Sequence, residues 1–127
     1  MKTTVSIEYD KQFNNRIKYY LQKKKVERKL NKLNEFGQKG VDRLQAATPV
    51  QTGKTANSWY YKIEKKNNDQ VSLVWYNTNV NNYVNIAIIL DTGHATVNGN
   101  WVQGYNYIDS AINPVIAEIK KYFREEE

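Results

Sequence analysis

The segment 47–59 limits what this 127-residue chain can fold into more than any other part of it. A residue that precedes proline is disfavoured in helical conformation, so the helical pattern upstream has to end at Thr48-Pro49. Glycine is free to adopt a positive φ, and we expect Gly53 to do so in a turn built from Pro49, Thr52 and Gly53. The run WYYKI that follows is aromatic and β-branched, which predicts a strand. The segment is therefore interpreted as a structural joint between a helix and a sheet.

Upstream of this joint, apolar residues recur at spacings of three and four and predict a long amphipathic helix. The stripe consists of Val26, Leu30, Leu33, Gly37, Val41, Leu44 and Ala47. Gly37 and Gly40 lie on or beside it, although glycine disfavours a helix by about 1 kcal/mol relative to alanine. Two glycines this close indicate either the approach of another backbone or a kink.

Downstream of the joint, two runs of alternating residues predict a β-hairpin over 58–66 and 70–77, because Asn67-Asn68-Asp69 between them tolerates left-handed turns. The alternation places one set of apolar side chains on one face: Trp59, Tyr61, Ile63, Val71, Leu73 and Trp75. Residues 83–90 are apolar nearly throughout from Ile86 onward, which predicts a third strand buried on both faces. Residues 94–104 predict a polar, glycine-containing loop that is too long for a tight hairpin.

The two ends of the chain complete the expected architecture. Alternation over residues 5–9 predicts a short strand, and Asp10 is expected to cap a helix that runs to Leu21 with an apolar stripe of Phe13, Ile17, Tyr20 and Leu21. Asp109 is expected to cap a last helix, whose apolar face is Ile112, Val115, Ile116, Ile119 and Phe123. We therefore predict one α+β domain over 1–127, in which a small, mainly antiparallel sheet is packed by a long N-terminal helix and a C-terminal helix. Residues 1–25 form its N-terminal strand and helix.

Composition restricts the function classes. The chain has no cysteine, which excludes disulfides, cysteine nucleophiles and thiolate metal sites. It has no run of eighteen apolar residues, and residues 1–20 lack the apolar core of a signal peptide, so we expect synthesis in the cytoplasm and no membrane contact. A net charge of +6 permits binding to nucleic acid without requiring it.

The single histidine, His94, follows Asp91 by three residues and is the only candidate for acid–base or metal chemistry. A zinc site needs three or four ligands, and neither a second histidine nor a cysteine is present. A nucleophilic triad needs a serine or cysteine beside an oriented histidine, and no serine of this chain lies in a nucleophile motif. We therefore expect His94 to be a structural turn residue, and we expect no enzymatic activity, no metal and no cofactor.

Three surfaces leave two interpretations open. The basic run Lys23, Lys24, Lys25, Arg28, Lys29 and Lys32 is typical of a solvated helix face but also suits phosphate contacts. The aromatic residues of the hairpin, with Lys62, Lys65 and Lys66, form either the core of the sheet or a stacking surface for single-stranded nucleic acid. Trp101 is either an exposed interface anchor or a lid folded over the edge of the sheet.

Three motifs resemble the tail-component family of long-tailed bacteriophages. The first motif is Ala47-Thr48-Pro49, followed by Thr52-Gly53 and Ser58. The second runs from Ile88 to Ala95 and is followed by Asn98-Gly99 and Trp101-Val102. The third runs from Tyr107 to Ile112. The resemblance covers roughly residues 26–123. Family members commonly carry glutamate at the position of Asp91 and arginine at that of Trp101, so the chain departs from the family pattern there.

The resemblance implies a non-enzymatic virion protein of the phage neck, made in the host cytoplasm, which acts in tail completion or head–tail joining. Such proteins form an oligomeric ring, here expected to be sixfold, between the head connector or stopper and the tail tube or terminator. Genome DNA passes through the lumen without sequence-specific binding. Residues Asp91, Gly93, His94, Gly99 and Trp101 are the candidate subunit or partner interface. The alternative is a small basic nucleic-acid-binding protein that uses Lys23–Lys32 and the aromatic hairpin.

Overall fold

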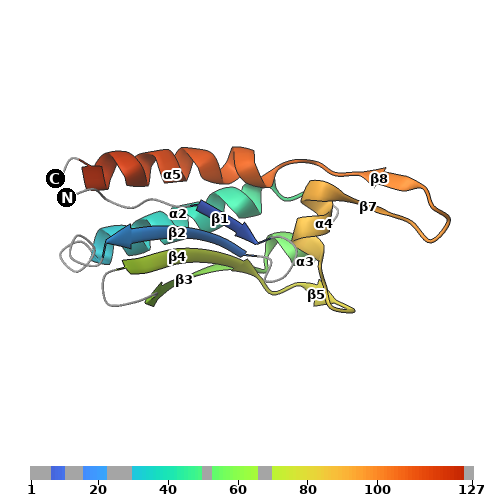
Figure 1. Cartoon of the computed structure of the whole chain (residues 1–127), viewed down its shortest axis with the longest axis horizontal. Coiled ribbons are helices and arrows are strands. Elements are labelled where there is room, and N and C mark those ends of the chain that lie inside the picture. Colours follow the sequence, from blue (N-terminus) through green and yellow to red (C-terminus); the bar gives the residue numbers. More distant parts are fainter. Residues whose placement is uncertain (1–6, 11–15, 23–29, 50–52, 66–69, 125–127) are drawn as a thin grey trace.

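The chain folds as an α+β domain in which two long helices accompany a four-stranded antiparallel sheet (Figure 1). The computed structural model describes residues 7–10, 16–22, 30–49, 53–65 and 70–124. The helices are α2 (Leu30–Ala47) and α5 (Ile108–Arg124). Helix α5 packs along α2, and α2 packs on the sheet. The predicted fold class is therefore confirmed.

The sheet consists of β1 (Ile7–Asp10), β2 (Arg16–Gln22), β3 (Trp59–Lys65) and β4 (Gln70–Asn77), in the order β1-β2-β4-β3. The predicted hairpin is confirmed as β3 paired with β4, although its turn at 67–69 lies outside the described residues. Its predicted inner face is also confirmed, because Trp59, Leu73 and Trp75 belong to the buried core. On the opposite face, Tyr60 stacks on Tyr76 with ring centroids 5.1 Å apart.

The helix predicted from Asp10 to Leu21 is wrong over residues 16–22, which form β2. Ile17, Tyr19 and Leu21 pair in register with Trp75, Leu73 and Val71, the core-facing positions of β4. The sequence RIKYYLQ satisfies both a helical spacing and a period of two. Pairing with β4, which lies about fifty to sixty residues further along the chain, selects the strand. A periodicity read from neighbouring residues cannot reveal such a long-range contact.

Helix α2 is confirmed, and it ends at Ala47 as the proline predicts. Its two central glycines accommodate aromatic rings rather than another backbone. A methyl group on Gly37 would overlap the ring of Tyr61, and one on Gly40 would lie 2.5 Å from Cε2 of Trp75. The indole nitrogen of Trp75 donates a 2.9 Å hydrogen bond to the Gly37 carbonyl. The glycines thus let the sheet place two large rings directly on the helix backbone.

Thr48 joins the end of α2 to the start of β3. Its buried hydroxyl donates to the Leu44 carbonyl at 2.6 Å and accepts the indole N–H of Trp59 at 2.9 Å. The turn expected nearby is partly wrong, because Gly53 does not have a positive φ and instead begins the short helix α3 (Gly53–Ala56) in open space. Thr52 lies outside the described residues. Gly53 and Thr55 have low helix propensity, so the sequence carries no clear signal for this one-turn helix.

Residues 83–90 do not form the predicted third strand. They contribute a two-residue strand, β6 (Val84–Asn85), and then helix α4 (Ile86–Thr92). Asn85 caps this helix, since its side-chain oxygen accepts the N–H of Ile88 at 3.4 Å. A short apolar run fits a buried strand or a buried helix equally well, and here the cap selects the helix.

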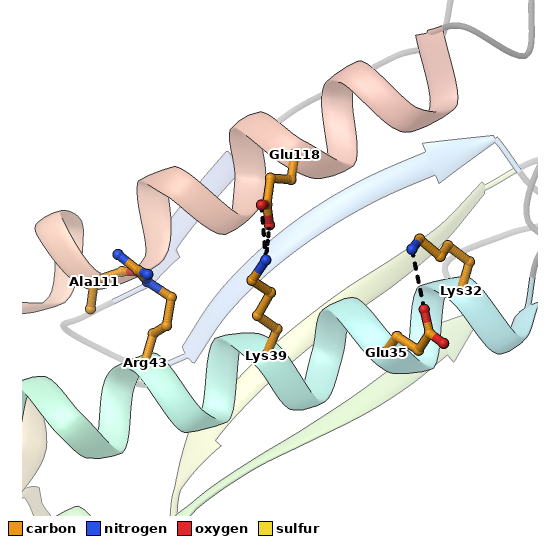
Figure 2. A network of polar contacts seen from close by, with 6 residues as sticks. All are labelled: Lys32, Glu35, Lys39, Arg43, Ala111 and Glu118. Carbon is orange, nitrogen blue, oxygen red and sulfur yellow. Dashed lines mark hydrogen bonds and ion pairs between the residues drawn. The ribbon is translucent and has the colours of Figure 1, made fainter.

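Helix α5 has the predicted apolar face, with Ile112, Val115, Ile116, Ile119 and Phe123 all buried. Figure 2 shows the polar contacts that join α5 to α2. Lys39 pairs with Glu118 at 2.7 Å, and the Arg43 Nε donates to the Ala111 carbonyl at 3.2 Å. Both members of the ion pair are about half exposed, so it adds little stability.

Candidate assembly interface

Exposed apolar side chains concentrate at one end of the molecule. Seven of the eight large hydrophobic residues that the described chain exposes lie between positions 80 and 105: Val80, Tyr83, Val84, Val97, Trp101, Val102 and Tyr105. They lie on or beside two small hairpins. In the first, β5 (Val80–Asn81) pairs with β6; in the second, β7 (Gly93–Ala95) pairs with β8 (Trp101–Gln103). Figure 1 shows both hairpins at the same end, on either side of α4. An apolar concentration of this kind is typical of an interaction surface.

The segment predicted as an irregular loop is the β7–β8 hairpin, so that expectation is wrong. His94 pairs with Val102 and Ala95 with Trp101, and five residues connect the two strands. The connection is closed by the Thr96 N–H, which donates to the Asn100 carbonyl at 2.7 Å, and by Gly99, whose φ is +82°. The hairpin extends well beyond the body of the molecule (Figure 1).

Gly93 and Trp101 are packed together at the base of this hairpin. Gly93 is buried and has a φ of +86°, and a methyl group there would lie 2.5 Å from the Val102 carbonyl oxygen and 2.9 Å from Cζ2 of Trp101. One edge of the Trp101 ring therefore covers the glycine, as an aromatic residue often does across a strand pair. The side chain is still 61% exposed, which matches an interface anchor more closely than a lid.

Asp91 attaches the hairpin to the helical body, a role that the sequence did not reveal. Its carboxylate is only 4% exposed and accepts the N–H of Ile108, the first residue of α5, at 2.9 Å. Its main-chain carbonyl accepts the N–H of Asn106 at 2.9 Å. Asp109, predicted as the cap of α5, is its second residue and leaves a buried oxygen without a hydrogen bond. Asp91 thus supports the hairpin from inside, whereas His94, Gly99 and Trp101 are exposed.

Tyr107 makes a second connection at the same place. Its buried hydroxyl donates to the carbonyl of Ala87 in α4 at 2.7 Å. Burial raises the pKa of this phenol above its ordinary range, which favours the protonated hydroxyl that donates this hydrogen bond. Helix α4 and the start of α5 are therefore fixed to each other on both sides of the hairpin.

We expect Asp91→Ala to lower the free energy of unfolding by about 1–2 kcal/mol, the usual effect of losing a helix cap. Asp91→Asn should retain most of the stability, because the amide oxygen can still accept the Ile108 N–H. Urea denaturation of the three proteins measures this difference. Equal losses for the two substitutions would show that the hydrogen bond is not the source of the effect.

The distribution of charge along the sequence marks the segment that contains both hairpins. Residues 70–108 carry one formally charged side chain, the buried Asp91, whereas residues 1–69 carry sixteen basic and seven acidic ones. Cores of protein–protein interfaces are depleted in charged residues. This uncharged stretch is the sequence signal from which the surface could have been identified without a structure.

The other candidate surfaces have less support. Trp59 and Trp75 are 7% and 0% exposed, so they belong to the sheet core and not to a stacking platform. Of the basic run, Lys32 alone lies among the described residues, where it pairs with Glu35 at 3.3 Å (Figure 2). His94 is exposed, and the described residues contain no group of three or more potential metal ligands.

Among the described helices, none has the length and apolar character needed to cross a membrane. Comparison of the chain with protein-family models, with curated proteins and with solved structures found no match. The case for a function therefore depends on the geometry above and on the sequence motifs.

Proposed function

We propose that this chain is a structural subunit of the neck of a long-tailed bacteriophage, acting in tail completion or head–tail joining. Its copies form a sixfold ring between the head connector and the tail tube. The observation that carries the proposal is the β7–β8 hairpin, an uncharged element that extends beyond the body of the molecule and carries a tryptophan that is 61% exposed. The resemblance of the three sequence motifs to the tail-component family supplies the specific role.

The shape of the molecule suits a ring with head-to-tail contacts. A hairpin that extends beyond its own domain can lie on the body of the next copy, and repetition of that contact around an axis closes a ring. The two sides of such a contact are different surfaces. The exposed apolar residues at positions 80–105 supply one of these two surfaces, and the body of the adjacent copy supplies the other.

The assembly state with and without DNA distinguishes this proposal from a nucleic-acid-binding function. Light scattering should show self-association, or association with a connector or tail-tube protein, that does not depend on DNA. A nucleic-acid-binding protein would instead remain monomeric and bind duplex DNA with an affinity that falls steeply with salt concentration.

We expect simultaneous replacement of Lys23, Lys24 and Lys25 by glutamine to change neither the melting temperature nor the assembly state. Charge runs of this kind are usually solvated, and exposed ion pairs contribute little to stability. Light scattering and duplex-DNA titration at two salt concentrations measure the outcome. If the run contacts phosphates, the triple variant will bind duplex more weakly and with a flatter salt dependence, which would favour the alternative function.

A further inference from the structure

The shorter hairpin, β5–β6, presents a tyrosine at its tip. Asn82 and Tyr83 form the two-residue turn between the strands, with φ angles of +51° and +65°. Positive φ at both positions is the requirement of a type I′ turn, where the second position favours glycine. Tyr83 occupies that second position, and its side chain is 100% exposed.

Within the part of the chain that the structure describes, no packing contact accounts for a tyrosine at position 83. A bulky residue in the left-handed region is strained, and a fully exposed ring gains nothing from packing in the monomer. Strained residues persist where surrounding structure or a function retains them. A glycine would fit the turn better, so the aromatic ring itself points to an interaction outside the chain.

The hairpin is held firmly enough to present that ring. Buried Asn85 donates to the Asn77 carbonyl at 3.1 Å, and Asn77 in turn donates to the Thr55 carbonyl at 2.9 Å. Asn79 donates to the hydroxyl of Thr55 at 2.7 Å. These amides tie the base of the hairpin to α3 and β4. An anchor presented on a preorganised support loses little entropy on binding.

Charge indicates which partner the ring meets. The chain has a net charge of +6, so its copies repel one another over most of their surface. The segment that carries Tyr83 is the exception, because residues 70–108 include no exposed charged side chain, although the exposed Lys54 of α3 lies near the base of the hairpin. The tip of this hairpin can therefore contact an adjacent copy without bringing a like charge against it. A nucleic acid or an acidic protein would be met by the basic remainder of the molecule.

We propose that Tyr83 is an anchor through which one copy of this chain binds the adjacent copy, its ring entering an apolar site on that copy. The inference rests on the proposed ring and adds a second contact to the one made by the β7–β8 hairpin. Both hairpins belong to the same uncharged end, so both take part in copy-to-copy contacts. Aromatic side chains at the centre of an interface commonly carry much of its binding energy.

The test compares self-association and stability in one set of variants. Tyr83→Gly should weaken self-association by tenfold or more, while its melting temperature stays the same or rises by about 2–4 °C because the turn is relieved. Tyr83→Phe should associate like the natural chain. Asn82→Gly changes the neighbouring position of the same turn, and it should leave self-association unchanged. Sedimentation equilibrium over a concentration series measures the association, and thermal unfolding measures the stability.

Equal self-association of Tyr83→Gly and the natural chain would overturn the inference while leaving the ring possible. A natural chain that stays monomeric at its highest soluble concentration would also overturn it, because Tyr83 would then have no second copy to bind. Conversely, association that depends on Tyr83 but yields a twofold dimer would support the anchor and contradict the proposed ring.

Discussion

Replacement of Gly40 by alanine is expected to lower the free energy of unfolding by about 2–4 kcal/mol. The added methyl group would lie 2.5 Å from Cε2 of Trp75, which is fully buried. Overpacking of this kind costs about 1–3 kcal/mol, and displacement of the indole would also break its hydrogen bond to the Gly37 carbonyl. The higher helix propensity of alanine recovers only about 1 kcal/mol.

Gly53→Ala is the matched control, because Gly53 is also helical and no atom lies within 4 Å of a methyl group there. It should leave stability unchanged or slightly higher. Urea denaturation followed by tryptophan fluorescence measures both variants. An unchanged midpoint for Gly40→Ala would show that Trp75 does not pack on the α2 backbone.

Trp101→Ser is expected to weaken association between copies at least about thirtyfold and to leave the monomer folded. Removal of a central aromatic anchor typically costs an interface 2 kcal/mol or more. The ring is 61% exposed and covers only the edge of Gly93 in the monomer, so the effect on the melting temperature should be small. Light scattering of the purified protein and its incorporation into particles are the two measurements.

Leu30→Ser is the control for this change, since Leu30 is the exposed apolar residue farthest in sequence from the hairpins and begins α2. It should assemble normally. If the two substitutions weaken assembly equally, loss of any exposed apolar residue is enough and Trp101 has no special place. If Trp101→Ser assembles fully, the β7–β8 hairpin is not the interface.

A helix or strand was predictable from the sequence where its hydrophobic pattern fits either the helical or the strand period, but not both. Helices α2 and α5 carry long stripes at spacings of three and four, and β3 and β4 alternate on both sides of a turn. Strand β2 and helix α4 were not predictable, because each run is short and fits both periods. Long-range pairing with β4 determines β2, and the Asn85 cap determines α4.

An interface at residues 91–101 stays a prediction, and the contacts that hold this segment in place were not predictable from the sequence. The exposed positions of His94, Gly99 and Trp101 agree with a surface at this segment. The role of Asp91 was missed because its partner, the Ile108 N–H, lies seventeen residues away and becomes a neighbour only when α4 meets α5. The role of Tyr83 was not predictable, because the apolar pattern predicts a strand from residue 83, where the structure has the second residue of a turn.

A cryo-EM reconstruction of the assembled phage neck tests the central claim most directly. We predict a closed ring of this chain in which residues 93–103 of every copy pack on the adjacent copy or on a neck partner, with Trp101 buried. A ring in which those residues face open solvent in every copy would contradict the interface, even though the ring itself was real. A neck that does not contain this chain would contradict the proposed function.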